Sequence, residues 1–460
     1  MIKKFIALLA IAAGFGVFAA AIGLDCHQAI AISIFSASIL GTLFFWDFRL
    51  SFAFMGTALL FCTRTIDISH FVAYSSLEVI LFLVGMMVLV GLLKESGLFS
   101  LITHLLLRVR HLSARKFVII LCLVSALMSA SIDEVTSIIF MVAAILEICD
   151  RLKVNPTPYI IISVLATNIG SAATVLGNPI GILIATKSGL TFEDFLIRAF
   201  PLAAVCLLAS IGICLIWYRN IFKEMDDSLR QFKGNTIEAA QKPLSVTRDL
   251  KISLIIFAAT LIAISLHHRL ELIWGLEPNT LLFVTPLIAA SLIFIWKRNN
   301  ARKYIERDVE WWTLLFFLLL FGQAGTLRYT GVTNELAKYL IQLSQSSLNM
   351  LTGCILWIAS IFSAILDNVV LVATIIPVIQ DFKTLGINAK PLWWALLFGG
   401  CLGGNITLVG STANIVALGI LEKEKKLRVN FMQWFGVGLA VGVTTTLIVW
   451  AALLFIPFYR

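Results

Sequence analysis

Charged side chains are scarce in this 460-residue chain. Only 13% of the residues are Asp, Glu, Lys or Arg, whereas 60% are hydrophobic. Soluble domains carry roughly 25% charged residues, so a water-soluble fold of this composition would lack the polar side chains needed to cover its exterior. A soluble globular protein is therefore excluded, and an integral membrane protein is expected.

Enzyme motifs are lacking as well. The sequence holds no HExxH, GxSxG or CxxC pattern, the six histidines show no metal-ligand spacing, and the eight cysteines lie mostly within apolar stretches. We therefore expect neither an enzyme, nor an organic cofactor, nor a disulfide framework. The net charge of +9 does not indicate nucleic-acid binding, because the basic residues lie in short loops between apolar runs instead of one patch.

What the sequence does contain is a series of apolar runs. A membrane-spanning helix needs about 20 residues. Two further apolar stretches, 117–148 and 348–380, are interrupted by polar residues, and each half is short for a crossing, which favours re-entrant hairpins that enter and leave on one side. The predicted fold is an all-α polytopic membrane protein with two such hairpins and about eleven transmembrane helices, at 5–24, 28–46, 51–63, 77–93, 158–186, 199–218, 252–270, 279–296, 310–327, 391–419 and 432–457.

The distribution of Lys and Arg predicts the topology. With a cytoplasmic N-terminus, the segments predicted to be cytoplasmic hold 26 of the 35 basic residues. The first hairpin is flanked by basic residues and should open to the cytoplasm, and the second should open outward; the flanking residues of the first are Arg108, Arg110, Arg115 and Lys116. We expect a plasma (inner) membrane protein with its C-terminus outside. The first apolar run is longer than a usual signal core, which favours a retained helix.

The two halves of the chain match each other. At an offset of 234 residues, Ser129 and Asp133 correspond to Ser363 and Asp367, and at an offset of 233, Gly177 corresponds to Gly410. Each copy would hold five crossings and a hairpin, and since five is odd the second copy should be inverted. The predicted organisation is an N-terminal helix over 1–27, repeat 1 over 28–218, a cytoplasmic loop over 219–251 and repeat 2 over 252–460.

Both hairpins have polar tips that we take as candidate ion-binding sites. Carboxylates at membrane depth are costly unless they are paired, hydrated or coordinated, so they are functional candidates. Alternatively, each tip aspartate only caps the helix that follows it. Glu134 has Asn368 as its counterpart and is the candidate proton carrier. The tip candidates are Ser129, Asp133, Glu134, Thr136, Ser363, Asp367 and Asn368.

Polar and glycine residues also interrupt the apolar runs 158–186 and 391–419. Such residues unwind a helix, so that freed carbonyl groups can coordinate a cation and half-helix N-termini can face an anion. Close helix packing through small residues is the alternative explanation. Oxygen ligands suit a hard cation, and a Na⁺ site is expected near Asp133, Asn178, Asp367 and Ser411. The candidates are Asn168, Thr174, Gly177, Asn178, Pro179, Asn405, Thr407, Gly410, Ser411, Thr412 and Asn414.

These motifs resemble those of the ion-transporter superfamily of arsenite permeases, the P protein, NhaD-type antiporters, and citrate and divalent-anion/sodium symporters. The run from Ser363 to Asn368 resembles the SAFLDN hairpin, and the residues from Leu392 to Asn414 resemble the LWWAL and LGGNxTLxGxxAN signature. The similarity covers about 77–460. The first half of the chain departs from the superfamily's motifs at two places. Asp133-Glu134 replaces the Asp-Asn of the LDN motif, and Gly177 to Gly181 (GNPIG) replaces the GDPPN motif.

The resemblance implies a scaffold plus a mobile transport bundle, often in a homodimer, that carries solute by alternating access. The expected function is Na⁺- or H⁺-coupled transport of a small inorganic or organic anion such as a carboxylate, within a lipid bilayer. A Na⁺/H⁺ antiporter using Asp133, Glu134 and Asp367 is the first alternative, and an arsenite-type efflux permease is the second. An ion channel would share the hydropathy, but paired one-sided hairpins favour a transporter.

Overall fold

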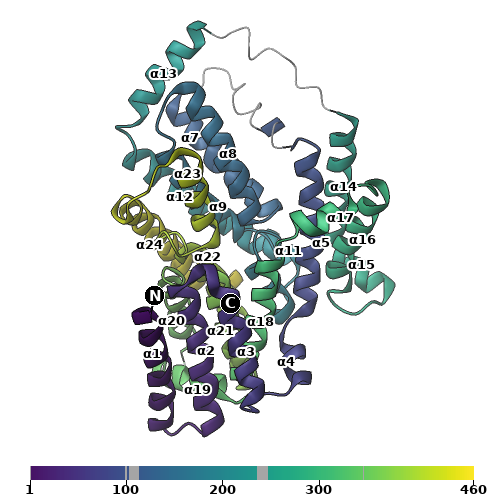
Figure 1. The fold of residues 1–460 in the computed structure, drawn as a ribbon, viewed down its shortest axis with the longest axis vertical. Coiled ribbons are helices and arrows are strands. Elements are labelled where there is room, and N and C mark those ends of the chain that lie inside the picture. Colours follow the sequence, from purple (N-terminus) through teal and green to yellow (C-terminus); the bar gives the residue numbers. More distant parts are fainter. Residues whose placement is uncertain (1, 99–100, 103–112, 236–246, 346, 460) are drawn as a thin grey trace.

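The computed structural model describes residues 2–98, 101–102, 113–235, 247–345 and 347–459. Within these ranges all regular secondary structure is helical, which confirms the all-α fold class (Figure 1). Arg108 and Arg110, which were expected to flank the first hairpin, lie outside the described residues.

Six of the described helices are long and apolar enough to cross a membrane, or up to eight if two bent pairs count as one span each. In the first bent pair, the helices Arg248–Ser265 and His267–Trp274 meet at a bend of 65°. In the second, Ala301–Asp308 and Trp311–Tyr329 meet at a bend of 61°. The number of helices that pass this test of length and composition is smaller than the predicted eleven crossings, because several of the expected crossings are interrupted or short. The apolar helices Thr157–Ser171 and Thr280–Trp296, for example, have only 15 and 17 residues.

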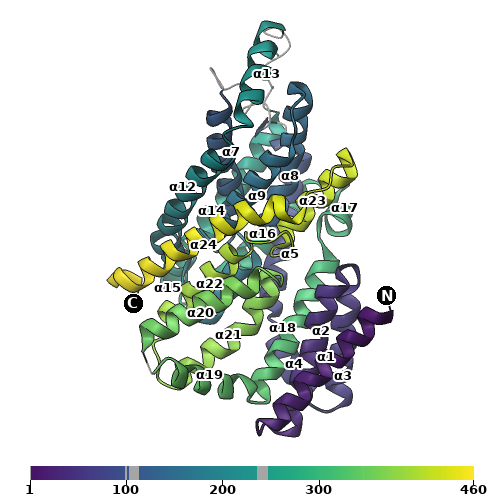
Figure 2. The same cartoon turned by 90° about the vertical axis from the view of Figure 1, so that its left-hand side faces the viewer.

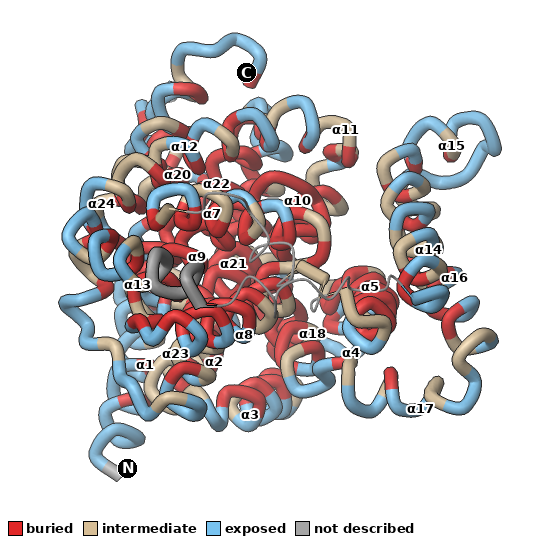
Figure 3. Tube along the Cα trace, turned by 90° about the horizontal axis from the view of Figure 1, so that it is seen from above, coloured by how far each residue is buried: buried red, intermediate tan, exposed pale blue. Residues whose placement is uncertain are grey.

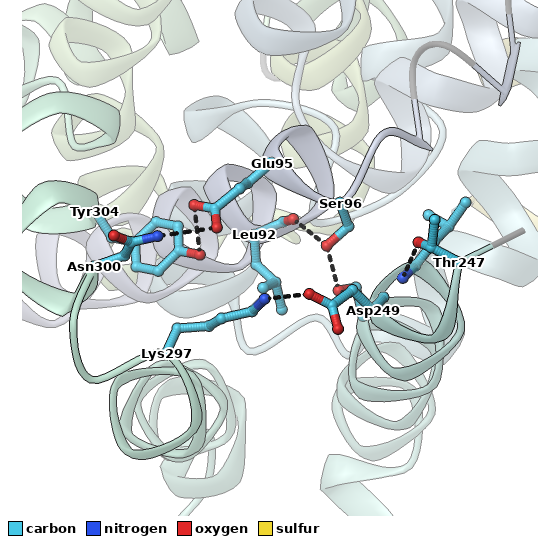
Figure 4. A network of polar contacts seen from close by, with 10 residues as sticks. Leu92, Glu95, Ser96, Thr247, Asp249, Lys297, Asn300 and Tyr304 are labelled. Atoms are coloured by element: carbon cyan, nitrogen blue, oxygen red, sulfur yellow. Dashed lines mark hydrogen bonds and ion pairs between the residues drawn. The ribbon is translucent and has the colours of Figure 1, made fainter.

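The helices pack into two groups (Figures 1 and 2). We call the first group the flanking bundle. In it α3 packs on α18, and α16 packs on α5. Polar contacts tie α5 to its neighbours: the Tyr304 hydroxyl donates to Glu95 at 2.9 Å, and Ser96 bonds Ser253 of α14 (Figure 4). The bundle consists of α1 (Ile2–Ala21), α2 (Cys26–Phe44), η1 (Trp46–Phe48), α3 (Arg49–Cys62), α4 (Ile68–Tyr74), α5 (Leu77–Glu95), α14 (Arg248–Ser265), α15 (His267–Trp274), α16 (Thr280–Trp296), α17 (Ala301–Lys303), η4 (Tyr304–Asp308) and α18 (Trp311–Tyr329).

The second group, the hairpin bundle, contains both candidate hairpins and both interrupted runs. Its centre is tightly packed: residues 158–178 and 391–406 are all buried, as the red tubes of α9 and α22 in Figure 3 show. The bundle consists of α7 (Ala114–Ser131), α8 (Glu134–Leu152), α9 (Thr157–Ser171), α10 (Pro179–Ser188), α11 (Phe192–Asp194), η2 (Phe195–Ala199), α12 (Phe200–Trp217), α20 (Leu348–Ser363), α21 (Asn368–Thr384), α22 (Lys390–Gly403), α23 (Thr412–Lys425), α24 (Phe431–Phe455) and η5 (Pro457–Tyr459). Helix α19 (Val332–Leu343) runs between α18 and α21.

Equivalent residues of the two halves make the same local contacts. The Thr174 hydroxyl donates to the Ala130 carbonyl, and the Thr407 hydroxyl donates to the Ala364 carbonyl. Packing between the halves is reciprocal as well: α8 packs on α23 while α21 packs on α10, and α9 packs on α23 while α22 packs on α10. Contacts exchanged in this way are what a pseudo-two-fold axis between two copies produces.

The segment 219–251, expected to be a loop, is helical in part. Helix α13 covers Phe222–Asn235, and α14 already begins at Arg248. Phe222 and Met225 are buried, and the Asp226 carboxylate accepts a hydrogen bond of 2.7 Å from the Ala114 amide at the start of α7. The segment is polar and only mildly amphipathic in sequence, which predicted a solvated connector, but the apolar residues of this short helix pack on α7 and α8.

Candidate functional site

The first hairpin turns at Ile132 and Asp133, between α7 and α8. The Asp133 carboxylate accepts hydrogen bonds from the amides of Val135 at 2.8 Å and Thr136 at 2.9 Å, so it caps α8. Asp133 is half-buried, whereas Glu134 is 1% exposed. The carboxylate of Asp133 is therefore held at the N-terminus of α8, and the next residue carries a second acid into the interior.

The second hairpin turns in the same way before α21. One Asp367 oxygen accepts from the Val369 amide at 3.0 Å, and the other accepts from the Thr412 hydroxyl at the start of α23. In the first half Pro179 stands in place of Thr412 and supplies no such hydroxyl. Asp367 thus links its hairpin tip to an interrupted helix, whereas Asp133 lacks this link because Pro179 has no hydroxyl.

The two tips meet at equivalent positions. The Asn368 side-chain amide donates to a Glu134 carboxylate oxygen at 3.1 Å, across a separation of 234 residues that is the repeat offset itself. Both residues are buried, at 1% exposure for Glu134 and 0% for Asn368. A contact between equivalent residues places both beside the pseudo-two-fold axis. Glu134 is therefore the acid shared by the two halves of the site.

Both apolar runs are interrupted near this point. Helix α9 ends at Ser171 and α10 begins at Pro179, while α22 ends at Gly403 and α23 begins at Thr412. Each second half-helix is capped by a side chain: Asn178 accepts from the Gly181 amide at 2.9 Å, and Ser411 accepts from the Ala413 amide at 3.2 Å. The N-termini of four helices therefore lie within the hairpin bundle. These helices are α8, α10, α21 and α23.

Buried amides hold the two interruptions together. Asn168 donates to the side-chain oxygens of Asn405 and Asn414, both at 2.9 Å. Asn414 in turn donates to the carbonyls of Gly404 at 2.8 Å and Thr407 at 2.9 Å, two of the groups freed by the break. Those carbonyls are satisfied within the protein in this conformation, although the Asn168 side-chain oxygen is buried without a hydrogen-bond partner.

Glycine is required at the interruptions for steric reasons. A Cβ atom at Gly177 would lie on the backbone of Ser171, and one at Gly410 would come within 2.8 Å of the Ser363 and Gly404 carbonyl oxygens. The turn thus folds back against the end of the preceding helix in both copies. Close packing through glycine, the alternative explanation, therefore occurs together with unwound backbone at the same positions.

A cavity of about 150 Å³ reaches the first tip from one end of the molecule, between the flanking bundle and the hairpin bundle. Lys94, Arg307 and Asp308 lie at its charged end, and it extends past Phe317 of α18. The candidate residues among its lining residues are Asp133, Glu134, Thr136, Pro179 and Thr412. The acids of the first tip and the start of α23 are thus accessible from this end.

A second cavity, of about 200 Å³, reaches Asp367 between α2 and the second tip, and Thr42 and Trp46 line it. Its Trp46 side lies close to the first cavity, because Arg49, stacked on Trp46, donates to Thr313 of the first cavity at 3.1 Å. Each tip aspartate therefore lines a cavity, Asp133 the first and Asp367 the second.

The two hairpin serines, Ser129 and Ser363, differ in their contacts. The Ser363 hydroxyl donates to the Gly400 carbonyl at 2.6 Å, whereas its counterpart Ser129 is fully buried without a described partner. Sequence reasoning missed Ser171 and Cys401, to which the Asn178 amide donates at 2.9 and 3.1 Å. Both residues lie within the interrupted runs, and their position at the end of an apolar run before a break is the signal that could have indicated them.

Comparisons with known proteins agree with this architecture. Residues 6–399 match the citrate transporter family CitMHS. An uncharacterized transporter of Mycobacterium tuberculosis, Rv2684, is 33% identical over 364 residues, covering 77% of this chain and 82% of that protein. The human P protein is 26% identical over 449 residues. The match covers 82% of this chain and 53% of the P protein, so this chain spans about half the length of the P protein.

Among solved structures, the YdaH transporter of Alcanivorax borkumensis has a similar fold. The TM-score is 0.54 at 17% sequence identity, and the match covers 86% of this chain and 88% of that one. The fold and these similarities define the class of the protein, which is an integral membrane transporter and not an enzyme. Within that class, the chain belongs to the CitMHS citrate transporter family. The resemblance noted in the sequence motifs is thereby confirmed.

Proposed function

We propose that this chain is a secondary active transporter, coupled to Na⁺ or H⁺, that carries a small inorganic or organic anion such as a carboxylate. The observation that carries the proposal is Glu134, a buried acid whose hydrogen-bond partner Asn368 is a neutral amide. A carboxylate at membrane depth that lacks a cationic partner is stabilised by binding a proton or a metal cation. Asp133 lies next to it, so a cation entering the cavity meets two acids.

The anion would bind where helix N-termini converge. The amides at the starts of α8, α10, α21 and α23 provide partial positive charge, and Asn and Ser side chains provide hydrogen-bond donors. Negative charge on the tip acids opposes an anion until the coupling cation has bound. Binding of the cation would therefore precede or accompany binding of the anion, which is the basis of coupling.

A Na⁺/H⁺ antiporter is the second candidate. The tips bring together the acids Asp133, Glu134 and Asp367, and the described contacts of Glu134 include no Lys or Arg side chain. Such a site suits a cation and a proton that compete for the same oxygens. An arsenite-type efflux permease remains the third candidate, by family resemblance alone.

Flux measurements in proteoliposomes test the proposal. Na⁺ and pH gradients would be imposed separately with citrate, succinate, arsenite or no added solute inside. Gradient-dependent uptake of an anion supports the symporter, and Na⁺-driven proton movement without added solute supports the antiporter. Asp133→Asn and Asp367→Asn should each reduce the flux to background, whereas Asp150→Asn, an exposed aspartate later on α8, should not. Full activity in both tip variants would show that these residues only cap helices.

We also propose that the protein lies in the plasma (inner) membrane with its N-terminus in the cytoplasm, and that it forms a homodimer. The topology is supported by the concentration of Lys and Arg in alternate loops. On this topology, the end of the molecule that carries Lys94 and Arg307 faces the cytoplasm.

A further inference from the structure

The two ends of the boundary between the bundles are packed differently. At one end α21 packs along α18, and α10 contacts α5. At the other end the counterpart of the first contact would be α8 along α5, and the described residues show at most marginal contact there. The cavity that reaches Asp133 and Glu134 occupies that position instead. One end of the site is therefore open while the other is closed.

Ion pairs cross the boundary at the closed end. Lys187 of α10 bonds Glu78 of α5 at 3.1 Å, and Arg328 of α18 bonds Asp381 of α21 at 3.3 Å. Arg328 also donates to Gln380 at 2.6 Å. The Asp381 side chain is only 10% exposed and also accepts a hydrogen bond from the Thr333 hydroxyl of α19. These contacts connect the flanking bundle to the hairpin bundle and are partly shielded from solvent.

Equivalent residues at the open end do not bridge the boundary. Lys94 is the counterpart of Arg328, and Glu147 is the counterpart of Asp381, at the same offset of 234 residues. Lys94 lies 3.8 Å from Asp308 within the flanking bundle, and Glu147 pairs with Arg151 on its own helix at 2.6 Å. The repeat therefore preserves a positive and a negative position at both ends, but they face each other across the boundary at only one end.

The small cavity at the closed end leads to the same conclusion. Arg328, Gly325 and Ala373 line a volume of about 200 Å³ whose lining includes no hairpin-tip residue. Their counterparts Lys94, Gly91 and Ile139 line the open cavity, which does reach the tip acids. The two cavities are related by the repeat, but only one leads to the site.

We propose that Arg328–Asp381 and Lys94–Glu147 are alternating latches: the first closes the site at the predicted external end, and the second forms when the hairpin bundle moves to close the cytoplasmic end. Lys187–Glu78 supports the first latch. The proposal rests on the transporter function proposed above, and it names the residues that hold each end closed. Breaking one latch should shift the population toward the state that the other latch stabilises.

Cysteine accessibility tests the latches directly. In a Cys26→Ser/Cys62→Ser/Cys354→Ser background, the reporters Ala373→Cys and Ile139→Cys occupy equivalent places in the closed and the open cavity. An impermeant thiol reagent is applied to intact cells for the first reporter and to inside-out vesicles for the second. The rate of labelling measures how often each end is open, and it requires neither a solute nor a gradient.

Asp381→Asn should raise the labelling rate of the Ala373→Cys reporter about fivefold and lower that of the Ile139→Cys reporter, because a partly shielded pair contributes on the order of a fivefold shift. Glu147→Gln should act in the opposite direction. Lys338→Gln, which breaks an exposed pair with Glu335 on α19, should change neither rate. Exchanging the charges in Arg328→Asp/Asp381→Arg should restore the rates of the parent background.

The proposal is overturned if Asp381→Asn leaves both reporters unchanged, or if both latch variants move a reporter in the same direction. A rise at both reporters in one variant would indicate general loosening of the packing and would overturn it equally. Because labelling is independent of flux, failure of the proposed anion or cation coupling leaves this test intact. A failed latch likewise leaves the flux experiment intact.

Discussion

Glu134 and Asn368 show how one substitution between repeats changes the chemistry of a site. The equivalent positions contact each other beside the pseudo-two-fold axis, so an acid in one copy lies against an amide in the other. A pair of asparagines there would carry no charge, whereas this pair provides one buried carboxylate to the whole protein. The sequence indicated that Glu134 lacks a matching acid, but it did not indicate that the unmatched residues touch.

At this scale we expect Glu134→Gln to flatten the pH dependence of flux, because the amide keeps the shape and a hydrogen-bond acceptor but cannot exchange a proton. The measurement is transport rate against pH in proteoliposomes. Glu422→Gln provides the matched control, since Glu422 is an exposed glutamate paired with Arg428 in the same bundle. A pH profile identical to that of the unmodified protein would argue against a proton role for Glu134.

Among the helices, the interruptions depend on close approach of backbones. Gly170 of α9 lies against the Ala126 backbone of α7, and its counterpart Gly403 of α22 lies against the Ser360 backbone of α20. The glycines that we took from the sequence as signs of unwinding therefore also allow helices to pack closely. Breaks between helices could be placed from glycine, proline and polar residues because these act locally on the backbone.

Gly170→Ala should destabilise the protein by about 1–3 kcal/mol, because an added methyl group would overlap the Ala126 backbone and force α7 and α9 apart. Gly212→Ala on α12 is the control, since no atom lies within 4 Å of the added group. There the higher helix propensity of alanine should leave stability equal or slightly greater. Thermal unfolding in detergent, followed by size-exclusion chromatography, compares the two. Equal melting temperatures would contradict the packing argument.

The whole molecule consists of two bundles that meet along a boundary closed at one end. The flanking bundle is joined internally by contacts such as Glu95–Tyr304 and Lys297–Asp249 (Figure 4). Among the described residues, the ion pairs that cross to the hairpin bundle are Lys187–Glu78, Arg328–Asp381 and Arg269–Glu193. Nothing in local sequence patterns indicates which end is open, because both ends carry similar residues.

The predicted topology can be checked with native cysteines. Cys26 and Cys62 are exposed and lie at helix ends predicted to be outside. An impermeant maleimide should label intact cells, and Cys26→Ser/Cys62→Ser/Cys354→Ser should remove that labelling, since the other described cysteines are buried. In this background Lys423→Cys, near the end of α23, should be labelled only after the cells are permeabilised. Labelling of Lys423→Cys in intact cells would show that the topology is inverted.

The amino-acid sequence by itself determined the membrane class, the all-helical fold class and the family resemblance. These follow from composition, from the length of apolar runs and from local motifs, all of which act within a few neighbouring residues. The tertiary structure decided which distant side chains meet: Glu134 with Asn368, Asn168 with Asn405 and Asn414, and Arg328 with Asp381. It also decided which end of the site is open, because that depends on how two whole bundles pack and not on any one segment.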